Sequence, residues 1–200
     1  MPASKAAFKV VFVCTGNICR SPMAEQILEQ KAAKHKLPIS VSSAGVMAMT
    51  GDPMTPQSAE AMTKRGYTPT KHISQDLTPK LLEEADLVLT ATLDHRSELA
   101  RMLPKASKYS FTIDEFARLT SFLSADPEFQ EEFKKKPKET REQYLKRAMQ
   151  EAVLLRGMVP TNLDPKDVID PYGESIEVYN EVAEHIDVML EIIVDWMAAQ

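Results

Sequence analysis

Apolar positions along the chain form short runs, separated by stretches with helical spacing. The runs are rich in β-branched and aliphatic residues, which is typical of strands buried on both faces of a sheet. The predicted strands cover residues 9–13, 39–43, 86–91 and 108–111, the last at an outer position. The predicted helices between them cover residues 23–34, 57–65 and 94–102. This alternation predicts an α/β fold with three layers (α/β/α) around a four-stranded parallel sheet.

The C-terminal part of the chain predicts only helices. A helix is expected over residues 114–123, a short second one begins at Asp126-Pro127 and ends at Pro137, and an amphipathic third one covers 139–156 before Gly157. A loop over 160–165 follows. We interpret residues 113–165, approximately, as a helical insertion before the last helix of a single domain that covers residues 1–200. The insertion is either a cap that extends the core or a surface that borders a cleft or recruits a partner.

The last helix is predicted over residues 174–197. Its apolar stripe indicates core packing rather than a cofactor surface. The stripe consists of Tyr179, Val182, Ile186, Met189, Leu190 and Ile193, with Trp196 near the end.

Composition and charge exclude several classes of function. With 200 residues, of which 44% are hydrophobic, the chain is long enough for one core. The net charge of −5 and the absence of a long basic segment argue against nucleic acid as a partner. No apolar run reaches membrane-spanning length and residues 1–9 lack the apolar core of a signal peptide, so we expect a cytoplasmic protein with no membrane contact. The four histidines are scattered, so no metal site is expected.

The strongest chemical signal lies where the first predicted strand meets the first predicted helix. Cys14 directly follows the apolar run, and Arg20 stands just before Ser21-Pro22, a typical helix start. Such a loop directs backbone N–H groups and the helix dipole at one point, which suits a phosphoryl group. Gly16 and Asn17 tolerate the left-handed conformations that the turn requires. The segment therefore predicts an anion-binding loop with a nucleophile at its floor.

Cys14 and Arg20 have complementary roles in such a loop. N–H groups and a cation favour the thiolate of Cys14, which is the nucleophilic form. Arg20 offers a planar fork that matches two phosphoryl oxygens, and Ser21 can donate its hydroxyl to the sulfur. A cysteine and an arginine at this spacing are also compatible with a small buried core residue. The surrounding strand, glycine, asparagine and helix start favour the functional interpretation.

Three motifs in the chain resemble those of one enzyme family. CTGNICRSPMAE at residues 14–25 resembles the active-site signature of the low-molecular-weight protein tyrosine phosphatases, whose relatives include protein arginine phosphatases and thioredoxin-coupled arsenate reductases. Ser42-Ser43-Ala44-Gly45 resembles the Ser-Ala-Gly turn of this family, and Asp170-Pro171-Tyr172-Gly173 resembles its acid motif before the last helix. The long segment 113–168 departs from the family, whose members have a short connection at this place.

The resemblance implies a role for each motif residue. Cys14 would be the nucleophile, Arg20 would bind the phosphoryl group, and Asp170 would act first as acid and then as base, without a metal or another cofactor. The expected phosphate-binding residues are Thr15, Gly16, Asn17, Ile18, Cys19, Arg20 and Ser21. The expected substrate pocket consists of Ile18, Met47, Met49 and Tyr172. Hydrogen bonds from Asn17, Ser21 and Ser43 are expected to support the loop, whereas His72 and Asp94 are interpreted as structural.

The substrate is predicted from the middle of the loop. Ile18 favours phosphotyrosine, because isoleucine accompanies this activity in the family and threonine marks the arginine phosphatases. A protein arginine phosphatase is the alternative, because Thr15 and the Pro-Met-Ala-Glu continuation also occur in that branch. Arsenate reduction is disfavoured by the lack of cysteine in residues 22–200, and a protein that only binds phosphotyrosine would need neither Cys14 nor Asp170. Expected partners are phosphotyrosine proteins, with a bacterial tyrosine kinase as one candidate.

Cys19 is the second of only two cysteines, and both lie in the loop. A neighbouring thiol can capture the sulfenic acid of an oxidised thiolate as a disulfide, which keeps the damage reversible. We therefore hypothesise that Cys19 protects Cys14 in a redox-regulated enzyme. The alternative is that Cys19 only packs under the loop.

Overall fold

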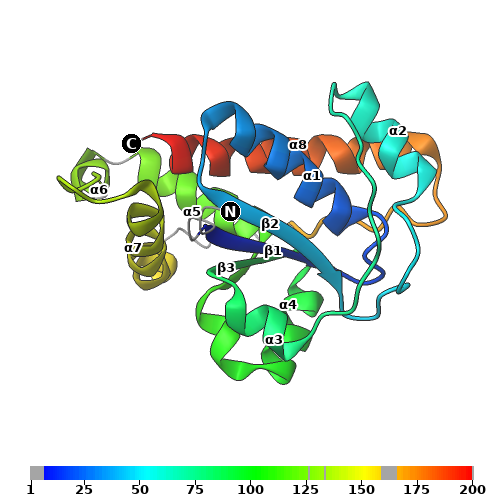
Figure 1. Cartoon of the computed structure of the whole chain (residues 1–200), viewed down its shortest axis with the longest axis horizontal. Coiled ribbons are helices and arrows are strands. Elements are labelled where there is room, and N and C mark those ends of the chain that lie inside the picture. The colour runs from blue at the N-terminus through cyan, green and yellow to red at the C-terminus, as the bar shows by residue number, and fades with distance from the viewer. Residues whose placement is uncertain (1–6, 126, 133, 159–165, 200) are drawn as a thin grey trace, which may run out of the picture.

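The computed structural model describes residues 7–125, 127–132, 134–158 and 166–199. Its sheet has four parallel strands in the order β2-β1-β3-β4. The strands are β1 (Phe8–Cys14), β2 (Ile39–Gly45), β3 (Leu87–Thr90) and β4 (Ser110–Thr112). The predicted α/β fold with a four-stranded parallel sheet is therefore confirmed. Because all strands run the same way, their carboxyl ends meet at one edge of the sheet (Figure 1).

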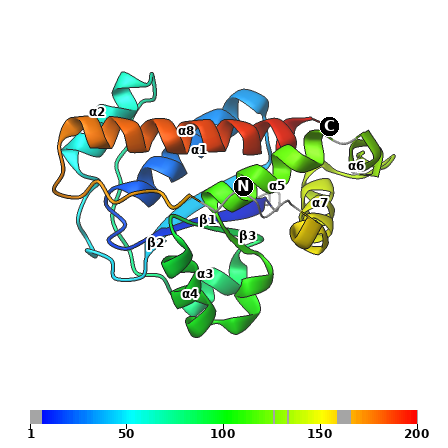
Figure 2. The ribbon, with the colours of Figure 1, turned by 180° about the vertical axis from the view of Figure 1, so that it is seen from behind.

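Helices cover both faces of the sheet (Figures 1 and 2). On one side lie α1 (Arg20–His35), α2 (Pro56–Lys64), α5 (Ile113–Ala125) and α8 (Ile176–Ala198), and on the other lie α3 (Pro79–Glu84), α4 (Leu93–Met102) and the 3-10 helix η1 (Pro104–Lys108). The sequence pattern does not predict α3, because a six-residue helix with Leu82 as its one buried residue carries no periodic signal. No helix in the described part of the chain is long and apolar enough to cross a membrane.

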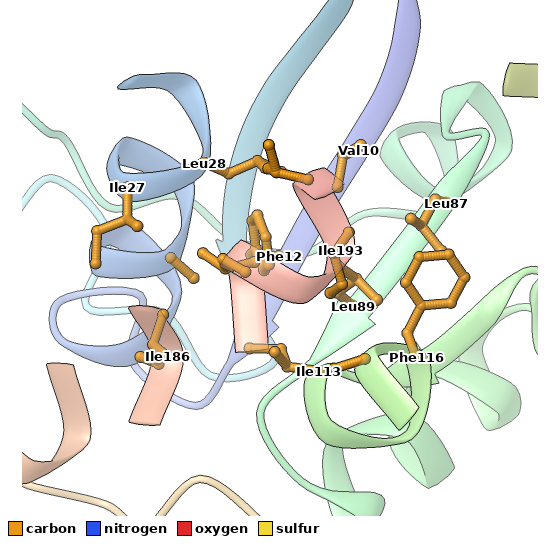
Figure 3. Packing of buried hydrophobic residues seen from close by; sticks show 14 of the residues in the cluster. Val10, Phe12, Ile27, Leu28, Leu87, Leu89, Ile113, Phe116, Ile186 and Ile193 are labelled. Carbon is orange, nitrogen blue, oxygen red and sulfur yellow. The ribbon is translucent and has the colours of Figure 1, made fainter. Parts of the chain in front are cut away.

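The strands are apolar on both sides because each side packs against helices. Val10 and Phe12 of β1, together with Leu89 of β3, belong to the larger core beneath α1, α5 and α8 (Figure 3). Val11 and Val13 face the opposite way, into the smaller core beneath α3 and α4. Packing on both faces therefore holds β1 in place and gives the loop that follows it a fixed starting point.

The last helix buries its apolar stripe as predicted. The stripe residues are buried except Met189, which is partly buried at the margin of the core. Trp196 is also buried and packs edge-to-face against Phe116 of α5, with 5.9 Å between the ring centroids. α8 therefore joins α1 and α5 into one helical layer.

The predicted insertion contains α5, α6 (Pro127–Glu132), α7 (Arg141–Leu155) and the 3-10 helix η2 (Arg156–Met158). α5 packs on α8 in the main layer, whereas α6 and α7 extend beyond it (Figure 1). The predicted end of this helix at Pro137 is wrong: α6 covers Pro127–Glu132, and residues 134–137 are not helical. Thr140 and Gln143 form a capping box at the start of α7. The predicted loop 160–165 lies outside the described residues.

α7 lies at the edge of the sheet where the strands begin. Its Lys146 Nζ is 3.7 Å from Oδ1 of Asp86, the residue before β3. Met149 of α7 lines the same groove as Phe8, the first residue of β1. Cys14 lies at the other end of β1. The described part of α7 is therefore remote from the predicted anion-binding loop.

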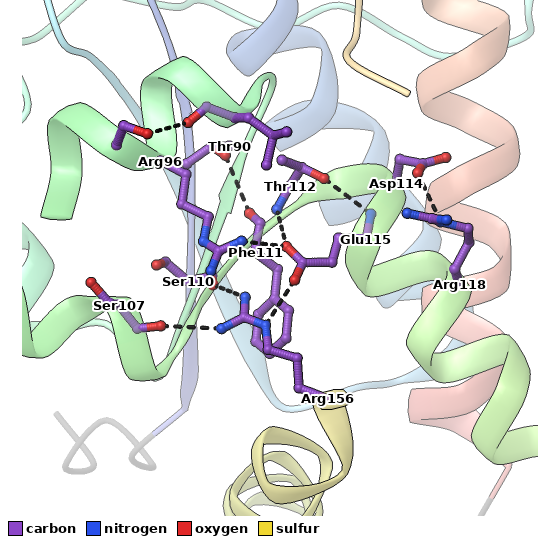
Figure 4. Close-up of polar contacts among 12 residues, drawn as sticks. Thr90, Arg96, Ser107, Ser110, Phe111, Thr112, Asp114, Glu115, Arg118 and Arg156 are labelled. Atoms are coloured by element: carbon purple, nitrogen blue, oxygen red, sulfur yellow. Dashed lines mark hydrogen bonds and ion pairs between the residues drawn. The ribbon is translucent and has the colours of Figure 1, made fainter. Parts of the chain in front are cut away.

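Arg156 attaches the end of α7 to the main layers (Figure 4). Its guanidinium lies 3.7 Å from the centroid of the Phe111 ring. Its Nε donates to Oε1 of Glu115 at 2.7 Å, and Oε2 of Glu115 accepts from NH1 of Arg96 in α4 at 2.9 Å. Glu115 thus bridges two arginines, one from the insertion and one from the opposite layer.

Candidate active site

The turn from β1 into α1 directs its carbonyl groups away from the centre of the turn. Each carbonyl oxygen of residues 14–19 accepts a hydrogen bond from the surrounding structure. The carbonyls of Cys14, Thr15 and Gly16 accept from the amides of Val46, Met47 and Met49, respectively. The carbonyl of Asn17 accepts from the His72 ring, and those of Ile18 and Cys19 accept from the amides of Thr55 and Met23. Because C=O and N–H point in opposite directions across a trans peptide, the amides that follow these carbonyls face inward. The turn is therefore built as an anion nest.

Asn17 holds this turn from within. It is fully buried and adopts a left-handed backbone conformation with φ of 56°. Its Nδ2 donates to Ser21 Oγ at 2.9 Å and to Ser43 Oγ at 2.8 Å, and its Oδ1 accepts from the Gln75 amide at 2.9 Å. The three residues expected to support the loop are thus brought together. Gln75 joins them by a contact across 58 positions that the sequence does not reveal.

His72 supports the same turn from outside. Its Nε2 donates to the carbonyl oxygen of Asn17 at 2.7 Å. Burial lowers the pKa of His72, so the ring is neutral and carries its proton on Nε2, because a carbonyl oxygen only accepts. Ser74 donates its hydroxyl to the Gly16 carbonyl at 3.0 Å. His72 therefore has the structural position that the sequence predicts, and Asp94 lies in the first turn of α4 outside the pocket.

Cys14 lies at the floor of the nest and is 2% exposed. Its Sγ is 3.0 Å from Ser21 Oγ. Since Ser21 Oγ already accepts from the Asn17 amide, its own proton is available to the sulfur. The contact places a hydrogen-bond donor where negative charge on sulfur would need one.

Arg20 is the first residue of α1 and is 4% exposed. Its NH1 donates to the Val168 carbonyl at 3.2 Å, and its NH2 donates to Thr15 Oγ1 at 3.3 Å and to Asp170 Oδ2 at 2.7 Å. Its Nε is buried without a partner among the described residues. Buried donors are normally satisfied, so Nε is suited to an acceptor that enters the pocket.

Asp170 reaches the pocket from the segment before α8. This segment is tied to the sheet edge by the Val168 amide, which donates to the Ala91 carbonyl at 2.9 Å, and by Asp167, whose Oδ1 accepts from the Leu93 amide at 2.9 Å. The side chain of Asp170 is 51% exposed although it pairs with Arg20. An acidic group therefore stands at the mouth of the pocket, above the nest.

Comparisons with known proteins agree with this geometry. The family pattern described as low molecular weight phosphotyrosine protein phosphatase matches residues 9–130. The chain belongs to this family. Its predicted membership and its enzyme class, a phosphatase, are thus confirmed.

Relatives of this phosphatase extend the match beyond the motifs. The chain is 28% identical to the protein-arginine-phosphatase of Bacillus subtilis, over 90% of the chain and 91% of that protein. It is 37% identical to a probable low molecular weight protein-tyrosine-phosphatase of Ralstonia nicotianae, over 59% of the chain and 77% of that protein. The crystal structure of a low molecular weight protein tyrosine phosphatase from T. tengcongensis is similar with a TM-score of 0.69 and 28% identity, covering 94% of the chain and 99% of that structure.

The pocket of the phosphatase collects most of the predicted site residues. It has a volume of about 200 Å³ and is lined by Cys14, Thr15, Gly16, Ile18, Cys19, Arg20, Met47, Met49, Asp170 and Tyr172. Ile18 is buried in its wall, whereas Met47 and Tyr172 are 75% and 59% exposed at its rim. Asn17, Ser21 and Ser43 stand behind this lining rather than in it. Residues of the insertion are absent from the described lining, so the alternative in which the insertion borders the cleft has no support in the described residues.

Cys19 lines the pocket, and its thiol contacts side chains from outside the loop. Its Sγ is 3.6 Å from Thr55 Oγ1 and 3.8 Å from the Tyr179 hydroxyl. Burial raises the pKa of the Cys19 thiol. Neither cysteine is in a disulfide. Cys19 is therefore a protonated thiol at the wall of the pocket.

His95 is a neighbour of the pocket that sequence reasoning missed. It lies in the first turn of α4, and its Nε2 is 2.9 Å from Thr15 Oγ1. The two residues are 80 positions apart, and an isolated histidine on a helix carries no signal of such a contact. The strand order, which places the end of β3 beside the end of β1, is the feature that brings them together.

Proposed function

We propose that this phosphatase hydrolyses phosphotyrosine in proteins through a cysteinyl-phosphate on Cys14. One observation carries the proposal: Cys14, Arg20 and Asp170 line a single pocket beneath which the loop amides face inward, and Nε of Arg20 has no partner among the described residues. Backbone donors and Arg20 would neutralise the equatorial phosphoryl oxygens. They would also stabilise the charge that develops in the transition state.

In the first step the thiolate of Cys14 attacks phosphorus. The S–P bond forms as the bond from phosphorus to the phenolic oxygen breaks, and Asp170 donates a proton to the leaving phenoxide. In the second step the Asp170 carboxylate takes a proton from water. The resulting oxygen attacks phosphorus, inorganic phosphate is released, and the sulfur leaves as a thiolate that accepts a hydrogen bond from Ser21.

The ion pair between Arg20 and Asp170 belongs to the phosphate-free state. The phosphoryl group and Asp170 compete for NH2 of Arg20, because this nitrogen lies 2.7 Å from Asp170 Oδ2. Binding of a dianion therefore releases the Asp170 carboxylate from Arg20 towards the leaving oxygen. The released carboxylate takes up a proton from solvent and in this form donates it to the leaving group. The half-exposed position of Asp170 gives it the room for this shift.

The lining of the pocket supports an aromatic substrate. Ile18, Met47, Met49 and Tyr172 present apolar groups above the nest, and thioethers make favourable contacts with aromatic rings. A protein arginine phosphatase remains the second candidate. It is favoured by the match to the Bacillus subtilis enzyme, which covers 90% of the chain, whereas the match to the Ralstonia nicotianae enzyme covers 59%.

A side-by-side assay tests the proposal. The wild-type protein is offered a phosphotyrosine peptide, a phosphoarginine peptide of the same sequence, and arsenate. We expect the highest kcat/KM for phosphotyrosine, no turnover with Cys14→Ser, and a loss of about 10²- to 10⁴-fold with Asp170→Asn. Ile18→Thr serves as the matched variant and is expected to lower this preference. A higher kcat/KM for phosphoarginine would contradict the assignment of the substrate.

The remaining expectations are part of the same proposal. Phosphoproteins are the substrate class, and a bacterial tyrosine kinase is the candidate that we favour. The single domain of residues 1–200 uses its insertion as a cap that extends the core, which agrees with the position of α7 at the far edge of the sheet. Both cysteines are free thiols, and free thiols persist best in a reducing compartment, which supports a cytoplasmic location.

A further inference from the structure

His95 occupies a closed position between two hydroxyl groups. It is 7% exposed. Its Nε2 is 2.9 Å from Thr15 Oγ1 in the phosphate-binding loop, and its Nδ1 is 2.7 Å from Oγ1 of Thr92, the residue that caps α4. The ring thus connects the cap of α4 to the loop that surrounds the phosphate site.

The chain of contacts continues from Thr15 to Arg20. NH2 of Arg20 donates to Thr15 Oγ1 at 3.3 Å. The same oxygen is in hydrogen-bond contact with Nε2 of His95, so it connects the guanidinium to the imidazole ring. Burial lowers the pKa of His95 to about 4, and the positive charge of Arg20 contributes to this shift. The ring is therefore neutral, with one donor and one acceptor nitrogen, and can satisfy both hydroxyls at once.

We propose that His95 is a positioning residue for phosphoryl transfer: it holds the Thr15 hydroxyl against the Arg20 guanidinium and thereby fixes the cation for the incoming phosphoryl group. The proposal rests on the function proposed above, in which Arg20 binds that group.

Arg20 needs a fixed hydrogen-bond acceptor because its other side-chain partner, Asp170, moves during the reaction. NH2 is shared by Thr15 and Asp170, and Asp170 must leave Arg20 to act on the leaving group. Thr15 and His95 stay in place, because the loop is bonded on all sides and His95 lies in a capped helix. Once Asp170 has moved, the Thr15 hydroxyl still accepts from NH2 of Arg20 and so maintains the orientation of the guanidinium.

Paired substitutions separate this role from simple packing. Gln at position 95 places its amide near the position of Nε2 and keeps a partner for Thr15, whereas Asn reaches only the position of Nδ1. Thr15→Val removes the hydroxyl at constant shape, and Thr15→Ser retains it. Ser97→Ala is the control on the same helix, because the Ser97 hydroxyl donates to the Leu93 carbonyl of its own helix.

The test measures kcat and KM for a small aryl phosphate, together with the binding of inorganic phosphate by equilibrium titration. We expect His95→Asn and Thr15→Val each to weaken phosphate binding and to lower kcat/KM by about tenfold, the size of one hydrogen bond to a charged group. His95→Gln and Thr15→Ser are expected to retain more phosphate binding and a higher kcat/KM than His95→Asn and Thr15→Val, respectively, whereas Ser97→Ala is expected to stay within about threefold of wild type. The double variant His95→Asn/Thr15→Val should be no worse than Thr15→Val alone, because both changes remove the same contact.

Phosphate binding that is unchanged in both His95→Asn and Thr15→Val would overturn the proposal, as would additive losses in the double variant. If His95→Asn does not fold, the comparison of Thr15→Val with Thr15→Ser decides the same question. Failure of the proposed function has a different signature, because the wild-type protein itself would then fail to hydrolyse the phosphotyrosine peptide.

Discussion

Replacing Asn17 by alanine is expected to weaken both the fold and the site. The substitution removes two bonds donated by Nδ2, to Ser21 and Ser43, and the bond that Oδ1 accepts from the Gln75 amide. A buried amide left without an acceptor costs about 1–3 kcal/mol. The backbone at this position has φ of 56°, and alanine adopts the left-handed region less readily than asparagine, at a cost of about 1 kcal/mol. Together with the lost hydroxyl contacts we expect a loss of about 4 kcal/mol.

Urea unfolding measures this loss directly. With an m value of about 2 kcal/mol per M, the midpoint should fall by about 2 M. Asn17→Gly is the matched variant, because glycine tolerates the positive φ but makes none of the bonds. It should therefore be more stable than Asn17→Ala by about 1 kcal/mol and still clearly less stable than the wild type.

The same variants report on the site. Loss of the Asn17 amide frees the Ser21 hydroxyl from its fixed orientation towards the sulfur of Cys14. We expect kcat/KM for an aryl phosphate to fall by about 10- to 100-fold in both variants, since a hydrogen bond to a charged group contributes about 1.5–3 kcal/mol. The reasoning is refuted if Asn17→Ala unfolds within about 0.5 M of the wild-type midpoint, where about 2 M is expected, or if Asn17→Gly restores full activity.

Three further predictions concern other parts of the molecule. Cys19→Ser should recover less activity than wild type after peroxide followed by thiol, because the sulfenic acid of Cys14 would lack its neighbouring thiol; equal recovery would contradict the protective role. His95 stays neutral in the fold with a pKa of about 4 but has an ordinary value of 6.5, so the unfolded chain takes up its proton first as the pH falls. The free energy of unfolding should therefore drop by about 2 kcal/mol between about pH 7 and about pH 5, and a His95→Gln variant measured in parallel should show a drop smaller by that amount. Leu145→Ala in the buried face of α7 should cost about 3 kcal/mol of stability in urea yet leave KM for an aryl phosphate unchanged, and a raised KM would show that the insertion reaches the site.

The sheet and the loop between β1 and α1 were predictable because their signals are local. A strand buried on both faces needs an unbroken apolar run, and the run before Cys14 supplies it. The cysteine, glycine, asparagine, arginine and helix start then follow within nine residues of sequence, from Cys14 to Pro22. Asp170 is distant in sequence, but its motif before the last helix marks it. The boundaries were less predictable, and α1 begins at Arg20 rather than at residue 23 because the loop itself turns into the helix.

The contacts that hold the loop were not predictable, because they join positions far apart. Gln75 and Ser74 approach the loop from a segment without regular structure, and no pattern in that segment indicates which carbonyl or amide it meets. His95 looks like any other isolated histidine on a helix. Its place beside Thr15 depends on the order of β1 and β3 in the sheet. Such contacts follow from the topology, which the local pattern leaves open.

The insertion does not line the pocket in the described residues, but a series of side-chain contacts connects it to the pocket loop. Arg156 at the end of α7 pairs with Glu115, and Glu115 also pairs with Arg96. Arg96 follows His95 in α4. The His95 ring contacts the Thr15 hydroxyl in the loop between β1 and α1. The links between side chains are two ion pairs and one hydrogen bond among groups that are at most partly exposed, and the step from Arg96 to His95 is along the chain of α4. α7, at the amino edge of the sheet, can therefore stabilise the position of α4, the helix that contacts the loop at the carboxyl edge, where the pocket lies.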